Sequence, residues 1–177
     1  LKSLKKIVSK EKIGIIKMEV ARSNKPDVKF LKGVRKLCDE NDIILIFDEC
    51  TTGFRENYGG LHKEIGVNPD VAIFGKTLGN GYAINAIIGK SKIMSNVTNT
   101  FISSTFWGER IGYAAALKSL EVMEKTKSWK KINSLGKKII KKLKNLSKLY
   151  NIKMSISEMP SIIKFDFNSK NNLNYKT

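Results

Sequence analysis

Histidine and cysteine are nearly absent from this sequence. One histidine, His62, and two cysteines, Cys38 and Cys50, occur among 177 residues. Neither cysteine has a spacing typical of metal ligands, so we expect no metal site, and one histidine cannot build a histidine-rich site. A serine–histidine triad has no support either, and we expect His62 in a loop or at the surface. So few cysteines favour a reducing compartment, which predicts a cytoplasmic protein.

Long apolar runs are also missing. The clearest purely apolar run, residues 43–47, has the length of a strand and is far too short to cross a bilayer. The chain opens with Leu1 and charged residues, which gives no support for a secretion signal. Because it also lacks a starting methionine, we expect it to be part of a longer protein, and we expect no membrane partner.

Arginine is scarce although the chain is strongly basic. The formal net charge is +17, and all but four of the 33 basic residues are lysine. Lysine is a hydrated point charge suited to solvated surfaces, whereas nucleic-acid sites usually rely on arginine and aromatic stacking. The charge alone therefore does not predict a nucleic-acid partner, and we expect none.

One lysine cluster leaves an alternative open. Residues 129–150 carry apolar side chains at helical spacing, and lysines fill the other positions. The simpler interpretation is a helix with a solvated face. The alternative is a basic module that binds nucleic acid or an anionic surface. The lysines concerned are Lys130, Lys131, Lys137, Lys138, Lys141, Lys142, Lys144 and Lys148.

The hydrophobic content of 41% is enough for a folded core. Strand-like runs alternate with helical patterns, which is typical of an α/β fold with a largely parallel sheet. The run at residues 43–47 has no polar interruption, so we expect a strand buried on both faces. The expected strands are 13–20, 43–47, 71–74 and 84–89, and the expected longer helices are 28–41, 109–124 and 129–150. Two later runs, 152–154 and 162–167, predict strands of a separate unit that begins near residue 150.

Two residues with complementary chemistry are expected where strands end. Asp48 follows the apolar run 43–47, and Lys76 follows the run 71–74. Ligands of α/β sheets gather outside the carboxyl ends of the strands. A carboxylate and an amine at that edge suit a cofactor with a basic ring nitrogen and an aldehyde, and pyridoxal 5′-phosphate has both groups. The simpler alternatives are a turn-forming Asp48 and a surface Lys76.

Three segments resemble class III pyridoxal-phosphate (PLP)-dependent aminotransferases, in particular members similar to glutamate-1-semialdehyde 2,1-aminomutase. The segments are ILIFDECTTGFR at 44–55, NPDVAIFGKTLGNG at 68–81 and SSTFWGE at 103–109. The resemblance covers residues 13–124 in the order of the family. The chain departs from the usual family pattern at Ala83 and at Gly108-Glu109-Arg110. Val20 also replaces the proline of a Glu-Pro motif, so Glu19 receives no catalytic role.

The resemblance assigns roles to four residues. It implies that Asp48 pairs with the ring nitrogen and that Lys76 is the Schiff-base lysine. Thr105 would bind the cofactor phosphate across a dimer interface, and Thr51 would flank the ring and contact its oxygen. A symmetric homodimer follows from the role of Thr105, because each subunit gives what it receives.

The resemblance also implies a fold, a domain organisation and an activity. The fold would be type I of the PLP-dependent transferases. Residues 1–150 would form the C-terminal part of the PLP-binding large domain with its connecting helices, and residues 151–177 would begin a small α+β C-terminal domain. The activity would be that of an aminotransferase or aminomutase, which moves an amino group between a small-molecule amino donor and a carbonyl substrate. An inactive fragment of such an enzyme is a further alternative.

Overall fold

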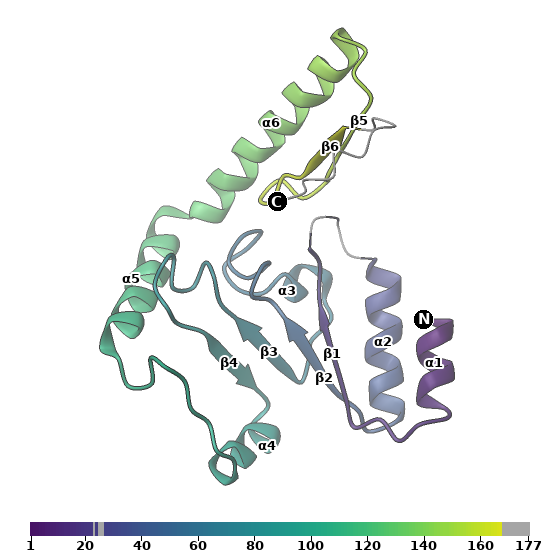
Figure 1. Ribbon diagram of the computed structural model, residues 1–177, viewed down its shortest axis with the longest axis vertical. Coiled ribbons are helices and arrows are strands. Elements are labelled where there is room, and N and C mark those ends of the chain that lie inside the picture. The colour runs from purple at the N-terminus through teal and green to yellow at the C-terminus, as the bar shows by residue number, and fades with distance from the viewer. Residues whose placement is uncertain (23, 25–26, 168–177) are drawn as a thin grey trace, which may run out of the picture.

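The computed structural model describes residues 1–22, 24 and 27–167, and Figure 1 shows them as a sheet flanked by helices with a long helix extending from it. The helical elements are α1 (Lys2–Val8), α2 (Val28–Glu40), α3 (His62–Ile65), α4 (Ser91–Met94), the 3-10 helix η1 (Ser95–Asn99), α5 (Arg110–Thr126) and α6 (Ser128–Leu149). The strands are β1 (Ile15–Glu19), β2 (Ile44–Asp48), β3 (Val71–Phe74), β4 (Ala86–Gly89), β5 (Met154–Ile156) and β6 (Phe165–Phe167).

The main sheet has four strands in the order β1-β2-β3-β4. The pairs β1–β2 and β2–β3 are parallel, and β4 runs antiparallel to β3 at the edge. The connection from β3 to β4, residues 75–85, contains no helix. A parallel crossover usually needs a longer segment with a helix, so the chain returns antiparallel instead. The expected α/β fold with a mostly parallel sheet is confirmed.

Helix α2 covers one face of this sheet. Asp27 caps its start by accepting a hydrogen bond from the Phe30 N–H at 3.0 Å. The apolar stripe of α2 then packs on Leu45 and Phe47 of β2, both fully buried. Helix α5 packs on the same face further along, where its Ala116 meets the β3 side chains. Each fully buried large apolar side chain contributes about 1.5–3 kcal/mol, so these contacts hold β2 and β3 in place.

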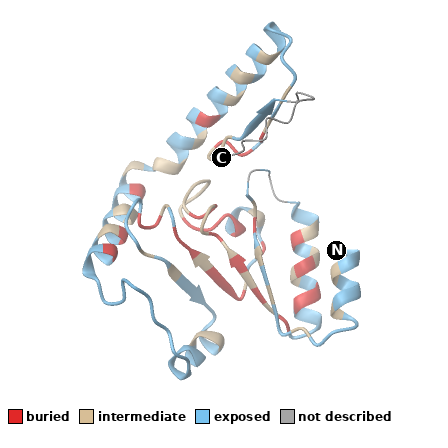
Figure 2. Cartoon of the chain, viewed as in Figure 1, coloured by how far each residue is buried: buried red, intermediate tan, exposed pale blue. Residues whose placement is uncertain are grey.

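The opposite face of the sheet is less covered, so within this chain the expectation of a strand buried on both faces is met on one face only. Along β2, Leu45 and Phe47 are buried while Ile44 and Ile46 are only half-buried. The packed clusters under α2 and α5 do not include Ile44 or Ile46. An apolar run shows that a strand is buried, but it does not show how many of its faces are covered. Figure 2 shows buried residues concentrated in β2, β3 and α2, whereas β4 is mostly exposed.

The long helix α6 leads to a small second sheet. Strands β5 and β6 pair antiparallel and lie alongside α6, as Figure 1 shows. Gly136 is the buried residue of α6, and the backbone carbonyl of Pro160 lies where a side chain would begin. The expected strands 152–154 and 162–167 thus occur, with shifted or shorter bounds. The domain boundary near residue 150 stays a prediction. The last ten residues of the predicted small domain, 168–177, lie outside the described residues.

The three expected longer helices occur as α2, α5 and α6, within two residues of their predicted bounds. Within the described ranges, no helix combines the length and the apolar character needed to span a bilayer.

Candidate active site

Asp48 and Lys76 lie at the carboxyl ends of two neighbouring parallel strands. Asp48 is the last residue of β2, and Lys76 follows the end of β3 by two residues. The register pairs Asp48 with Ile73, so the two strands end side by side. Neighbouring strands are about 4.8 Å apart, which brings both residues to the same edge. This placement agrees with the sequence-based expectation, while the roles of the two residues stay predictions.

The Lys76 side chain is oriented by a threonine of the preceding motif. Its Nζ donates a hydrogen bond to Thr51 Oγ1 at 2.8 Å. Gly75, immediately before it, lies against Asn85 and Cys50, and a Cβ at Gly75 would meet the Cys50 Sγ at 3.1 Å. The chain can therefore turn closely past Cys50 and present Lys76 toward Thr51. Thr51, expected beside a cofactor ring, is the hydrogen-bond partner of the amine.

The Asp48 carboxylate has two partners and remains partly exposed. Its Oδ1 accepts a hydrogen bond from the Cys50 N–H at 3.1 Å, and its Oδ2 lies 3.1 Å from Lys17 Nζ. Partial burial raises the pKa of Asp48, but the Cys50 N–H and the Lys17 ammonium outweigh it, so the net pKa is lowered. Asp48 is therefore an anion at neutral pH.

Cys50 interacts with both candidate residues. Burial raises the pKa of its thiol, with a further rise from Asp48 and an opposing effect from Lys76 and Lys17. Within the described part of the chain, Asp48 and Lys76 form no direct ion pair with each other. The structure thus brings Asp48, Thr51 and Lys76 to one edge, where the carboxylate and the amine have separate partners.

Thr105 is not brought to this cluster. It lies in an exposed segment between η1 and α5. Among the described residues, no side-chain hydrogen bond joins it to Asp48, Thr51 or Lys76. Its expected role in a partner subunit's site stays a prediction.

A buried acid next to Asp48 was not assigned a role from the sequence. Glu49 has an exposed fraction of 0% and accepts hydrogen bonds from Thr52 Oγ1 and from the N–H groups of Leu61 and His62. Burial raises the pKa of Glu49, but its hydrogen bonds to His62 and Thr52 and to the backbone outweigh this, so the net pKa is lowered. Glu49 thereby ties the loop after Asp48 to the start of α3.

The expectation for His62 is wrong, because its side chain is buried. The residue begins α3, and its Nδ1 lies 2.9 Å from Glu49 Oε1. A lone histidine in a glycine-rich stretch suggested an exposed position. The available signal was the Asp48-Glu49 pair. Successive side chains of a strand alternate between faces, so Glu49 points away from the face of Asp48. A buried acid on that face needs a hydrogen-bond partner.

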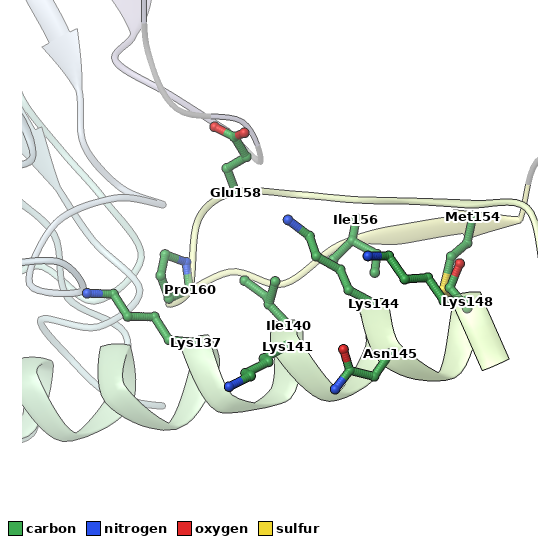
Figure 3. Close-up of a pocket in the computed structure, with 11 residues that line it drawn as sticks. Lys137, Ile140, Lys141, Lys144, Asn145, Lys148, Met154, Ile156, Glu158 and Pro160 are labelled. Carbon is green, nitrogen blue, oxygen red and sulfur yellow. The ribbon is translucent and has the colours of Figure 1, made fainter.

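The lysine cluster of α6 borders a different hollow. A groove of about 650 Å³ runs between α6 and the β5–β6 sheet. Figure 3 shows lysines of α6 along this groove with Ile140 and Ile156 between them. Its lysines are Lys137, Lys141, Lys144 and Lys148. The groove contains none of the residues at the β2–β3 edge, and the alternative of a nucleic-acid or anionic-surface module stays untested.

Comparison with known proteins identifies the family. The family model for "Aminotransferase class-III" matches residues 21–177. This chain belongs to the class III aminotransferase family. The expectation drawn from the three motif-bearing segments is thereby confirmed.

Curated class III aminotransferase relatives are moderately similar in sequence. A 3-aminobutyryl-CoA aminotransferase from Cloacimonas acidaminovorans is 37% identical over 147 residues, which are 78% of this chain and 36% of that protein. A glutamate-1-semialdehyde 2,1-aminomutase from Methanocaldococcus jannaschii is 34% identical over 154 residues, 85% of this chain and 36% of that protein. The chain thus spans about a third of the length of these relatives.

Solved structures confirm fold type I. The FumI protein of Sphingopyxis sp. MTA144 superposes with a TM-score of 0.87 at 22% identity, over 93% of this chain and 42% of that one. Ornithine aminotransferase from Plasmodium yoelii gives a TM-score of 0.82 at 22% identity, over 94% of this chain and 46% of that one. At these identities the likeness concerns the fold.

Proposed function

We propose that the full-length protein is a PLP-dependent aminotransferase or aminomutase and that this chain supplies its amine and its ring-binding carboxylate. Family membership supports the proposal, and the juxtaposition of Lys76 and Asp48 carries it for this chain. Asp48 ends β2, and Lys76 lies just beyond the end of the neighbouring strand β3. The amine of Lys76 donates a hydrogen bond to Thr51, and the Cys50 N–H donates one to the carboxylate of Asp48.

The chemistry of these residues fits pyridoxal 5′-phosphate. A protonated pyridine nitrogen needs an anionic partner, and the lowered pKa of Asp48 keeps its carboxylate charged. An aldehyde needs an amine that can reach it, and Lys76 is exposed at the same edge. When bound, the cofactor supplies an electron sink for the bonds at a substrate amino carbon.

The chain's own residues would then hold and move protons. Asp48 would accept a hydrogen bond from the ring nitrogen and keep that nitrogen protonated. Lys76 Nζ would anchor the cofactor, be displaced by the substrate amine, and then take a proton from the substrate Cα and return it as an acid. Thr51 Oγ1 would orient Nζ through the observed hydrogen bond.

The substrates proposed are a small-molecule amino donor and a carbonyl compound. The named relatives act on different compounds, a 3-aminobutyryl-CoA and a glutamate-1-semialdehyde, so the proposal covers the shared chemistry of amino-group movement. We also propose a homodimer, in which Thr105 of each subunit would bind phosphate in the site of the other, and a cytoplasmic setting. The resemblance of the segment 103–109 to the family's phosphate-binding segment supports the dimer proposal.

The proposal is tested by locating the lysine that binds the cofactor. The full-length protein is incubated with pyridoxal 5′-phosphate, reduced with borohydride, digested and analysed by mass spectrometry. We expect the label on Lys76 and loss of both label and transamination in Lys76→Ala. The control is Lys12→Ala, an exposed lysine ahead of β1. Label on another lysine, or transamination retained by Lys76→Ala, would contradict the assignment.

A further inference from the structure

Lys17 lies beside the candidate site although it belongs to none of the three motif segments. The parallel register pairs Lys17 with Ile46 and Glu19 with Asp48. Side chains two residues apart along a strand share one face of a sheet. Lys17 and Asp48 therefore lie diagonally on the same face, and the ammonium reaches the carboxylate at 3.1 Å.

The contact of Lys17 with Asp48 offsets a repulsion between two acids that the strand register brings together. Glu19 and Asp48 are direct neighbours across two strands, and like charges in such positions repel. Glu19 lies 3.7 Å from Arg22 Nε, while Asp48 pairs with Lys17. Each acid thus has its own cation. The Cys50 thiol also interacts with Asp48, and the Lys76 amine acts on that thiol.

Both oxygens of Asp48 are engaged before any ligand arrives. The Cys50 N–H occupies Oδ1, and Lys17 occupies Oδ2. A protonated ring nitrogen that bonds this carboxylate would share it with a second positive charge. Because like charges at one carboxylate raise each other's energy, the ring nitrogen would hold its proton less firmly than beside an unshared carboxylate.

We propose that Lys17 is a positioning residue that keeps Asp48 ionised and lowers the proton affinity of a pyridine nitrogen bound to the same carboxylate. The part that concerns the ring rests on the proposed function, whereas the coupling of Lys17 to Asp48 does not. The Lys17 side chain is 56% exposed, so solvent screens the effect. The expected shift for the ring nitrogen is therefore about half a pKa unit.

The first experiment measures the carboxylate in the full-length protein without cofactor. Carbon-13 NMR follows the titration of the Asp48 carboxyl group, which is assigned with Asp48→Asn. We expect Lys17→Met to raise the pKa of Asp48 and Lys17→Arg to restore it, because arginine keeps the charge. Lys12→Met, which removes an equal charge elsewhere, should titrate as the wild type does. An unchanged pKa in Lys17→Met would overturn the coupling.

The second experiment measures the ring. The holoprotein carries pyridoxal 5′-phosphate labelled with nitrogen-15, and the ring-nitrogen shift is followed against pH. We expect Lys17→Met to raise the pKa of the ring nitrogen and Lys17→Arg to behave as the wild type does. If wild type and Lys17→Met titrate alike while the cofactor is bound, the inference fails and the proposed function stands. If the wild type binds no pyridoxal 5′-phosphate, the proposed function fails, and so does the part of the inference that concerns the ring nitrogen. The coupling of Lys17 to Asp48 is then decided by the first experiment alone.

Discussion

Asp48 and Asp70 lie at opposite ends of neighbouring strands and differ in how completely they are bonded. Asp70 directly precedes β3 and is 7% exposed. Its Oδ2 accepts hydrogen bonds from Arg35 Nη1 and from the Leu45 N–H, both at 2.8 Å, and its Oδ1 lies 2.6 Å from Lys90 Nζ. Asp48 ends β2 with one N–H and one exposed cation as partners.

The difference separates a structural acid from one that can receive a ligand. Burial raises the pKa of Asp70, but the Leu45 N–H and the cations of Lys90 and Arg35 outweigh it and bring it to about 2. Asp70 is surrounded by groups of its own chain. Asp48 is also ionised, yet its side chain keeps 22% of its surface exposed at the carboxyl edge. Charge alone therefore does not distinguish the two acids, whereas the surface that remains accessible does.

The largest expected effect is on stability. Asp70→Ala leaves the buried Leu45 N–H without its acceptor and leaves the mostly buried Arg35 guanidinium with only the exposed Asp39, which should lower the free energy of unfolding by about 3 kcal/mol. Asp48→Ala should lower it by less than about 1 kcal/mol, because its ion-pair partner is exposed. Denaturant unfolding of both variants of the full-length apoprotein measures this. Equal losses would erase the distinction between the two acids.

The next effect is a pH dependence. A carboxyl with a folded pKa of about 2 and an unfolded pKa of about 4 stabilises the fold fully above about pH 4. That contribution, about 2.5 kcal/mol, is lost as the pH falls from about 4 to 2. The free energy of unfolding should therefore fall more steeply between about pH 4 and pH 2 in the wild type than in Asp70→Asn. An equal pH dependence in both proteins would show that Asp70 does not cause the loss of stability in acid.

The smallest effect concerns the exposed cation at Asp70. The Lys90 side chain is 63% exposed, and Arg35 with the Leu45 N–H still holds the carboxylate in its absence. Lys90→Met should therefore cost about 0.5 kcal/mol or less in the free energy of unfolding. The same denaturant experiment measures it. A loss as large as that of Asp70→Ala would mean that the buried partners do not suffice.

Much of the fold could be predicted from local patterns. The apolar runs before Asp48 and Lys76 and the helical spacing in α2 and α6 placed those elements within a few residues. The antiparallel direction of β4 and the number of covered faces could not be predicted in the same way. Both depend on which elements pack together, and an uninterrupted apolar run at 43–47 looks the same whether one face or two are covered.

The candidate site was predictable only in part. Asp48 and Lys76 could be placed because each lies at or just beyond the end of an apolar run that forms a strand. The contacts of Lys17 and His62 depend on strand register and on how the loop after Asp48 folds back. A lysine inside a β-branched run, two residues before an acid, was the available signal for Lys17. It acquires meaning only when β1 is known to pair with β2 in parallel.

The backbone at Lys76 has a practical consequence for engineering. Its φ of 39° lies in the region that glycine adopts freely and that other residues occupy at a cost of about 1–2 kcal/mol. A search for heat-resistant variants would therefore be expected to favour glycine at this position. Glycine at this position would remove the amine on which the proposed chemistry depends. A substitution that raises thermal stability here would therefore abolish the proposed catalysis.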